Sequence, residues 1–239
     1  MFLGAQLCPP DVLLTLPRLV IPDRFSPGLE GQIGTRGEAD DWCGGHNDTV
    51  GTCVLTAIAN AVRCWSDGAT VVEDDWIVGL YRTATGYDGT PTSDHGTRIP
   101  PLLERWRGGG ILLAGGEPDL LMGWKLTDAS NLKAAIALGG CALVVCNMPR
   151  DVVTQDPQAA WTVGLGPDAA PGSLGPHCML AIAMDTEGVT LVTWKREQTV
   201  TLSWMIKYTR EVYALAHADW APESGHTLAQ IIEAENALK

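Results

Sequence analysis

The order of sequence patterns along the chain constrains the fold most, because helical patterns fill the first part and strand patterns follow. Apolar residues at helical spacing predict a helix over residues 54–65. Acidic residues in a first turn, prolines at a helix start and glycines at a helix end predict further helices over 73–84, 100–107 and 130–138. Short apolar runs bounded by turn residues predict strands over 142–145, 178–184, 189–194 and 211–217, with one short helix over 202–208. Helices followed by antiparallel strands indicate an α+β fold, with a helical N-terminal lobe packed on a C-terminal sheet.

The two ends of the chain differ in composition from its middle. Residues 1–41 are rich in proline and glycine, which predicts an extended arm with one short strand near 18–21. We expect one domain over residues 42–220. Residues 221–239 form a C-terminal tail, with an amphipathic helix over 228–238.

The net charge of −12 excludes several classes of partner. An acidic chain repels phosphate backbones and anionic lipid surfaces, so we expect neither nucleic-acid nor membrane binding. No apolar run approaches the roughly 20 residues of a membrane span. The seven cysteines are scattered without a CxxC pair, and no signal peptide is visible at Met1. These features favour free thiols in a reducing compartment.

Cys53 is the strongest candidate for a catalytic residue. It follows Gly51 and Thr52 and directly precedes the predicted helix over 54–65. The positive end of a helix dipole favours the nucleophilic thiolate. Far downstream, His177 precedes the apolar run over 178–184, where it can serve as a base.

No metal or cofactor site is expected from the remaining motifs. Cys43 and His46 have the spacing of a zinc pair but lack a second pair, since structural zinc takes four ligands. The glycine run at 108–110 lacks the lysine of a phosphate loop and reads as a helix stop. Asp94 and His95 are interpreted as loop residues.

The arrangement around Cys53 and His177 resembles that of papain-like cysteine peptidases. Asn47 stands six residues before Cys53, where that family has a glutamine that donates to the oxyanion. His177 follows 124 positions after Cys53 (177 minus 53), near the roughly 130–150 expected. Thr193 stands in place of the asparagine that orients the histidine, with Trp194 directly after it. The resemblance implies a catalytic set of Cys53, His177, Asn47 and Thr193, a peptide or protein substrate and no cofactor.

The motifs are most similar to papain-like proteins of bacteriophages and prophages. The segments that carry this similarity are Asn-Asp-Thr-x-Gly-x-Cys ending at Cys53, Ser-Asp-His-Gly over 93–96, Pro-Gly-Ser-x-Gly-x-His ending at His177, Val-Thr-Trp over 192–194 and Glu-Val-Tyr-Ala over 211–214. They imply a location in the host cytoplasm or in the virion. Three functions stay open. The first is a thiol hydrolase of peptides or amides. The second is a catalytically weak or inactive papain-like protein with a structural role in a phage particle, where its partners would be other virion proteins. The third is a cell-wall amidase.

Overall fold

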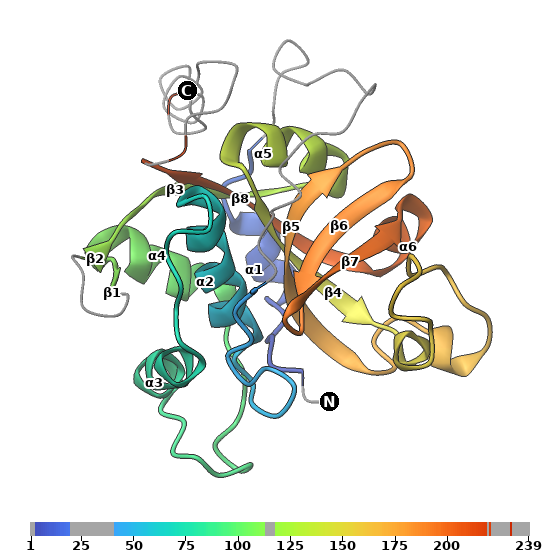
Figure 1. Cartoon of the computed structure of the whole chain (residues 1–239), viewed down its shortest axis with the longest axis horizontal. Helices are drawn as coiled ribbons and strands as arrows, with labels where there is room; N and C mark the ends of the chain where they lie inside the picture. The colour runs from blue at the N-terminus through green and yellow to red at the C-terminus, as the bar shows by residue number, and fades with distance from the viewer. Residues whose placement is uncertain (1–2, 20–40, 113–117, 219, 221–229, 231–239) are drawn as a thin grey trace.

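A computed structural model of the chain describes residues 3–19, 41–112, 118–218, 220 and 230 (Figure 1). The helices are α1 (Pro10–Thr15), α2 (Cys53–Trp65), α3 (Asp74–Thr85), α4 (Ile99–Gly109), α5 (Leu132–Gly139) and α6 (Leu202–Tyr208). The strands are β1 (Ile111–Leu112), β2 (Pro118–Asp119), β3 (Leu121–Thr127), β4 (Ala142–Met148), β5 (Gly175–Met184), β6 (Gly188–Thr193), β7 (Arg196–Thr201) and β8 (Thr209–His217). Short 3₁₀ turns cover Ala129–Asn131, Arg150–Val153 and Pro167–Ala169.

Six of these strands form one antiparallel sheet in the order β3-β8-β4-β5-β6-β7. Alternate side chains of a strand point to opposite faces, and both faces are buried at its centre. In β5, Cys178 and Leu180 pack into the cluster around α2, whereas Met179 and Ala181 pack into a second cluster on the other face. Burial on both faces explains why the central strands read as continuous apolar runs.

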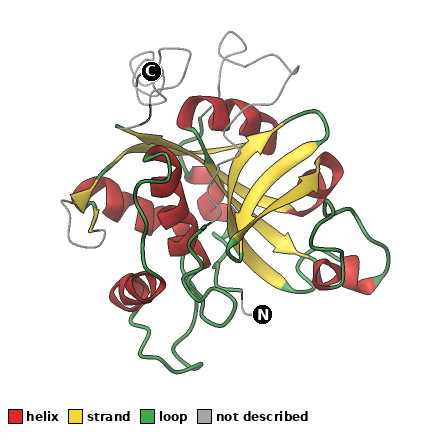
Figure 2. Cartoon of the chain, viewed as in Figure 1, coloured by secondary structure: helices red, strands yellow, loops and turns green. Residues whose placement is uncertain are grey.

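The helix α2 packs directly on β5, and Cys53 at its first position lies beside Cys178, the residue after His177 in that strand. Nearly every residue of α2 is buried, because α3 and α4 cover it on the side away from the sheet (Figure 1). The helix α5 packs against β8 and β5 on the opposite face. Figure 2 shows the resulting division into a largely helical part and a part dominated by strands.

The expected α+β fold, with a helical N-terminal part and a C-terminal antiparallel sheet, is confirmed. The short helix at 202–208 has the predicted bounds, and the helices predicted over 54–65, 73–84, 100–107 and 130–138 agree to within two residues at each end. Among the strands, β5 begins at Gly175, so His177 lies inside a strand rather than before one. The sequence reading missed α1, β1, β2, β3 and β7.

There are physical reasons why the sequence did not predict β3 and β7. In β3 a bulge between Leu121 and Gly123 interrupts the alternation, and β7 is an edge strand that keeps polar residues on its exposed face. Arg18 of the expected strand over 18–21 forms an isolated parallel bridge with Leu126, and residues 20–21 lie outside the described part. The tail helix over 228–238 also lies outside it, apart from Gln230. Among the described helices, none combines the length and apolar character needed to cross a membrane.

Candidate active site

Cys53 is the first residue of α2 and is 1% exposed. The turn that leads to it is fixed by Thr52, whose hydroxyl donates to the Gly45 carbonyl at 2.6 Å. The backbone N–H groups of a first helical turn have no partner inside the helix, so they face the region around the Cys53 sulfur. The backbone amide of Cys178 also lies beside this sulfur, which places the thiol next to β5 at the residue after His177.

A carboxylate that the sequence reading assigned to an ordinary loop holds the same turn. Asp94 accepts from the Gly51 N–H at 3.0 Å and 3.2 Å through its two oxygens. The Tyr81 hydroxyl donates to Asp94 at 2.6 Å and accepts from the Gly96 N–H at 2.8 Å. Burial, together with the Asp94 carboxylate, raises the Tyr81 pKa, so the hydroxyl keeps its proton. Asp94 is therefore a positioning residue for the turn that presents Cys53.

His177 is fully buried in β5, and its two ring nitrogens have different surroundings. Nε2 lies 2.9 Å from the Thr193 hydroxyl oxygen, and Nδ1 has no hydrogen-bond partner among the described residues. The ring stacks on Trp194 with centroids 4.9 Å apart and planes at 20°. The tautomer with the proton on Nε2 lets Thr193 accept it and leaves the Nδ1 lone pair free.

The tight turn between β6 and β7 positions Thr193 beside His177. Thr193 pairs with Arg196, so Trp194 and Lys195 form a two-residue connection. Both have positive φ, 46° and 63°, as a type I′ turn requires, although neither is glycine. Stacking on His177 holds Trp194 in this conformation, and an ion pair holds Lys195.

That ion pair connects the turn to the loop that contains Asn47. Lys195 Nζ lies 2.5 Å from Asp74 Oδ2, and Asp74 Oδ1 accepts from the N–H groups of Gly44 and Gly45 at 3.0 Å and 2.7 Å. The aliphatic stem of Lys195 occupies the space that a side chain at position 44 would need. Asp74 and Lys195 thus join the two parts of the molecule on either side of the candidate site.

Asn47 lies in this loop and is 4% exposed. Its backbone N–H donates to the Gly44 carbonyl at 3.0 Å. Its side-chain amide makes no hydrogen bond to another residue in the described part of the chain. Since Thr52 also bonds to Gly45, the loop returns to the start of α2. The amide of Asn47 is therefore a donor without a hydrogen-bond partner among the described residues, in the loop that leads to α2.

Residues 3–8, which we call the cover segment, lie across this site. Gly4 is in van der Waals contact with Gly51, and its backbone amide lies beside the Cys53 sulfur. A Cβ built on Gly4 would overlap the Gly51 backbone. On the other side, Leu3 packs near Gly175, two residues before His177.

Hydrogen bonds fix the cover segment at both of its ends. Thr97 donates its N–H to the Gly4 carbonyl at 2.8 Å and accepts from the Gln6 N–H at 3.0 Å, as in a strand pair. The Cys8 N–H donates to a Glu211 carboxylate oxygen at 2.8 Å. Tyr213 donates to the other Glu211 oxygen at 2.6 Å, and burial raises the Glu211 pKa.

Burial under the cover segment dominates the electrostatics of the site. Desolvation raises the Cys53 thiol pKa to about 11, although nearby backbone N–H groups pull it down. Desolvation also lowers the His177 pKa to about 3. The sequence led us to expect a low thiol pKa, and the closed site shows the opposite. A helix dipole contributes roughly 0.3–1 kcal/mol, which is less than the cost of burying a charged thiolate.

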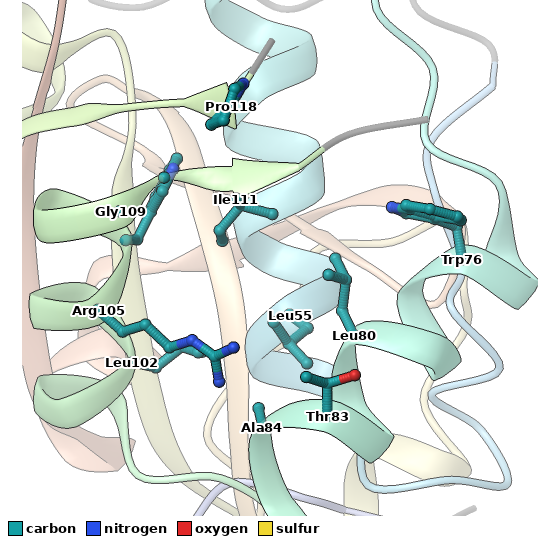
Figure 3. Close-up of a pocket in the computed structure, with 12 residues that line it drawn as sticks. Leu55, Trp76, Leu80, Thr83, Ala84, Leu102, Arg105, Gly109, Ile111 and Pro118 are labelled. Carbon is teal, nitrogen blue, oxygen red and sulfur yellow. The ribbon is translucent and has the colours of Figure 1, made fainter. Parts of the chain in front are cut away.

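A separate pocket of about 280 Å³ lies on the other side of α2 (Figure 3). Leu55 lines it, and a residue two positions after Cys53 faces away from Cys53 on a helix. Leu80 and Thr83 reach it from α3 and Arg105 from α4 (Figure 3). None of the proposed catalytic residues lines this pocket, so it is not part of the Cys53 site.

The residues that the sequence suggested as a zinc pair do not form a metal site with others in the described ranges. No group of three or more histidine, cysteine or acidic side chains converges there. The Cys43 N–H and carbonyl bond to the Asn60 side chain, and His46 lies 3.4 Å from Asp75 at the surface. Both residues therefore have structural partners.

Comparisons with known proteins relate this arrangement to a known fold. No protein-family model and no curated protein sequence matches the chain. Among solved structures, it is similar to xylellain, a cysteine protease from Xylella fastidiosa, with 12% identity and a TM-score of 0.63 over 89% of this chain and 95% of that one. It is also similar to the cysteine protease and lectin-like domains of Cwp84, a surface layer associated protein of Clostridium difficile, with 9% identity and a TM-score of 0.53 over 86% of this chain and 56% of that one. The chain therefore has the fold of papain-like cysteine proteases.

Proposed function

We propose that the protein is a papain-like thiol hydrolase that cleaves peptide or other amide bonds with Cys53 as nucleophile and His177 as base. The observation that carries the proposal is the contact between His177 Nε2 and Thr193, which leaves the Nδ1 nitrogen unpartnered. A base needs such a lone pair, held in one orientation, beside the group that it deprotonates. The position of the Cys53 sulfur beside the Cys178 amide supports the same assignment.

The proposed reaction balances its protons between these two residues. His177 Nδ1 takes the Cys53 proton, and the thiolate attacks the carbonyl carbon of the substrate. The Cys53 N–H and the Asn47 amide stabilise the oxyanion that forms. Nδ1–H then protonates the leaving amine, which departs and leaves a thioester. His177 deprotonates a water molecule that hydrolyses the thioester and releases the acid.

Thr193 and Asp94 have supporting roles in this reaction. The Thr193 hydroxyl holds the imidazole ring and accepts the Nε2–H while the ring is positively charged. Asp94 fixes the Gly51 backbone, and so it fixes where the Cys53 sulfur points. Neither residue needs to exchange a proton with the substrate.

An extended peptide is the substrate class that the site favours. The cover segment itself lies in the site with an extended backbone and pairs with Thr97 through two backbone hydrogen bonds. Backbone pairing of this kind accepts many sequences, because it reads the main chain rather than side chains. In this proposal the cover segment must leave before a substrate can enter, so the described structure is a latent form.

The test is cleavage of a peptide library, prepared by digesting a complex protein mixture, by a variant whose cover segment is weakened. Gly4→Ala serves this purpose, because the new Cβ overlaps Gly51. New peptide termini, identified by mass spectrometry, should appear with Gly4→Ala and disappear with the double variant Gly4→Ala/Cys53→Ser. Equal products from both variants, or none from an opened Gly4→Ala chain, would refute the hydrolase proposal.

The alternative function is a structural protein, such as a phage virion component, that keeps the fold without turnover. The observation in its favour is the burial of both Cys53 and His177, at 1% and 0% exposure. This alternative predicts that no change to the cover segment produces Cys53-dependent cleavage. The link to phage proteins and the resulting location in cytoplasm or virion rest on the sequence motifs alone and form part of this proposal.

A further inference from the structure

Two cysteines far from the candidate site lie beside each other at the junction of α2 with the sheet. Cys64 is the second-last residue of α2, and Cys141 lies between Gly140 and β4. Their side chains interact with each other, and both thiols are free. They belong to the same hydrophobic cluster, which also contains Cys53 at the other end of α2.

The backbone around this pair is held in place by neighbouring contacts. The Trp65 indole N–H donates to the Gly139 carbonyl at 2.7 Å, one residue after Cys64 and two before Cys141. Gly140, which has φ of 78°, ends α5, and its N–H donates to the Ile136 carbonyl at 2.7 Å. The Trp65–Gly139 bond holds the residues that flank the two cysteines against each other. A disulfide then requires the two side chains to rotate into its specific geometry.

Exposure distinguishes Cys64 from the other thiols. The structure describes all seven cysteines, and Cys64 is the only one of them that is partly exposed rather than buried. A dissolved oxidant therefore meets Cys64 first. Cys141 is the thiol that lies beside it, at 0% exposure.

We propose that Cys64 and Cys141 form a disulfide when the protein meets a small disulfide oxidant such as oxidised glutathione. The Cys64 thiolate attacks the glutathione disulfide, which forms a mixed disulfide and releases one glutathione thiolate. The Cys141 sulfur, after losing its proton to solvent, attacks the Cys64 sulfur and releases the second glutathione. The two protein thiols lose two electrons and two protons in all, and the oxidant becomes two glutathione molecules.

The attack of the Cys141 sulfur on the mixed disulfide at Cys64 is the slow step. Burial and the adjacent Cys64 thiol raise the Cys141 pKa well above its ordinary value, so its thiolate is rare at neutral pH. The reaction should therefore accelerate between pH 7 and pH 9. Once formed, the bond is shielded on the Cys141 side, so reduction should be slow as well.

The cross-link ties the end of α2 to the start of β4, the strand that pairs with β5 and His177. It joins residues 77 positions apart (141 minus 64), and closing a loop of that length stabilises a fold by restricting the unfolded chain. We expect the melting temperature to rise by roughly 5–15 °C on oxidation. The bond leaves Cys53 untouched, so this inference does not depend on the proposed hydrolase activity.

The test uses the full chain incubated with oxidised glutathione at pH 8.5, followed by peptide mapping without reduction. We expect a peptide pair joined through Cys64 and Cys141, a mass loss of two hydrogens and the higher melting temperature. Cys64→Ser should lose both effects, and the matched control Cys43→Ala should keep them, since Cys43 has no thiol neighbour. Cys141→Ser should also lose both effects. Because that substitution changes a fully buried residue, the Cys141→Ser chain can fail to fold, and Cys64→Ser alone then tests the inference.

Three results would overturn the inference. The first is a stable glutathione adduct on Cys64 with a free Cys141 thiol. The second is a different pair, above all Cys53 with Cys178, whose thiols also lie near each other. The third is an unchanged melting-temperature rise in Cys64→Ser.

Discussion

Gly4→Ala tests whether the cover segment controls access to Cys53. Gly4 contacts the Gly51 backbone and also lies against Gly96, so there is no space for a methyl group at this position. The substitution changes neither the Cys53 nor the His177 side chain and leaves the contact between His177 and Thr193 in place. The one interaction it removes from Cys53 is the Gly4 backbone amide beside the sulfur. It should therefore displace residues 3–8 and expose the thiol without altering the catalytic groups.

The size of the effect follows from the contacts that hold the segment. Three backbone N–H bonds anchor it, two shared with Thr97 and one to Glu211, each contributing about 1 kcal/mol net. The Gln6 side-chain amide adds a bond to the His95 carbonyl at 2.7 Å and a longer one to the Gly96 carbonyl at 3.4 Å. Together these bonds limit the population of the open state, in which residues 3–8 have left the site, to at most roughly one molecule in 100. Forcing a methyl group into a packed contact costs about 1–3 kcal/mol. Each step of about 1.4 kcal/mol changes an equilibrium constant by a factor of ten. Gly4→Ala should therefore raise the open population, and with it the rate of Cys53 labelling, by roughly 5- to 100-fold, at which point every molecule is open.

The assay is iodoacetamide labelling of Cys53 at pH 7.5, followed by mass spectrometry. Gly79→Ala is the matched control, because a Cβ at this helical glycine of α3 meets no atom within 4 Å. We expect wild type and Gly79→Ala to label slowly and Gly4→Ala to label faster. A single cooperative urea transition in all three chains, with the same slope, would show that the fold is intact, although the strain should lower the Gly4→Ala midpoint. If Gly4→Ala labels at the wild-type rate, the cover segment does not limit access and this reasoning fails.

Further predictions concern Asn47, Thr193 and His177, with hydrolysis measured in the Gly4→Ala background. Asn47→Ala should lower kcat by roughly 10²–10³ with little change in stability, because it removes an oxyanion donor; unchanged kcat would exclude that role. Thr193→Val should lower kcat roughly 10- to 100-fold and Thr193→Ser much less, because only the hydroxyl matters; equal losses in both would point to packing instead. Burial holds the His177 pKa at about 3, below its ordinary 6.5, so its contribution to stability is full above pH 6.5 and is lost as the pH falls toward 3. Urea unfolding should therefore show an extra loss of about 2 kcal/mol between pH 7 and pH 5 that His177→Gln lacks; identical losses in the two proteins would contradict it.

The sequence predicted the elements whose patterns are local. The apolar face of α2 and the apolar runs of β4 and β5 appear as period and length in the sequence, so these elements were placed correctly. The turn before Cys53 and the apolar run after His177 were likewise visible in the sequence, because both are short segments, although His177 lies inside β5 rather than before it. The contact between Thr193 and His177 agrees with the role that the resemblance gave to Thr193, although its function stays a prediction.

The sequence could not show the contacts that join distant segments. Asp94 bonds to Gly51 across 43 positions, and Lys195 reaches Asp74 from the other part of the molecule. Nothing in their local sequence separates these charges from solvated ones. The closed state of the site was also invisible, because it depends on where residues 3–8 lie. One signal was present: Gly4, Gly51 and Gly96 all lack side chains where three backbones meet.

The most direct test of the Cys53–His177 pair is the pH dependence of Cys53 alkylation between pH 4 and pH 10 in the Gly4→Ala chain, with and without His177→Gln. We expect rapid labelling that persists well below the ordinary thiol pKa of about 8.5 when His177 is present, because an imidazolium beside the sulfur stabilises the thiolate. In His177→Gln the labelling should rise only near that ordinary value. The same profile in both chains would mean that His177 does not activate Cys53, and the central claim would be wrong.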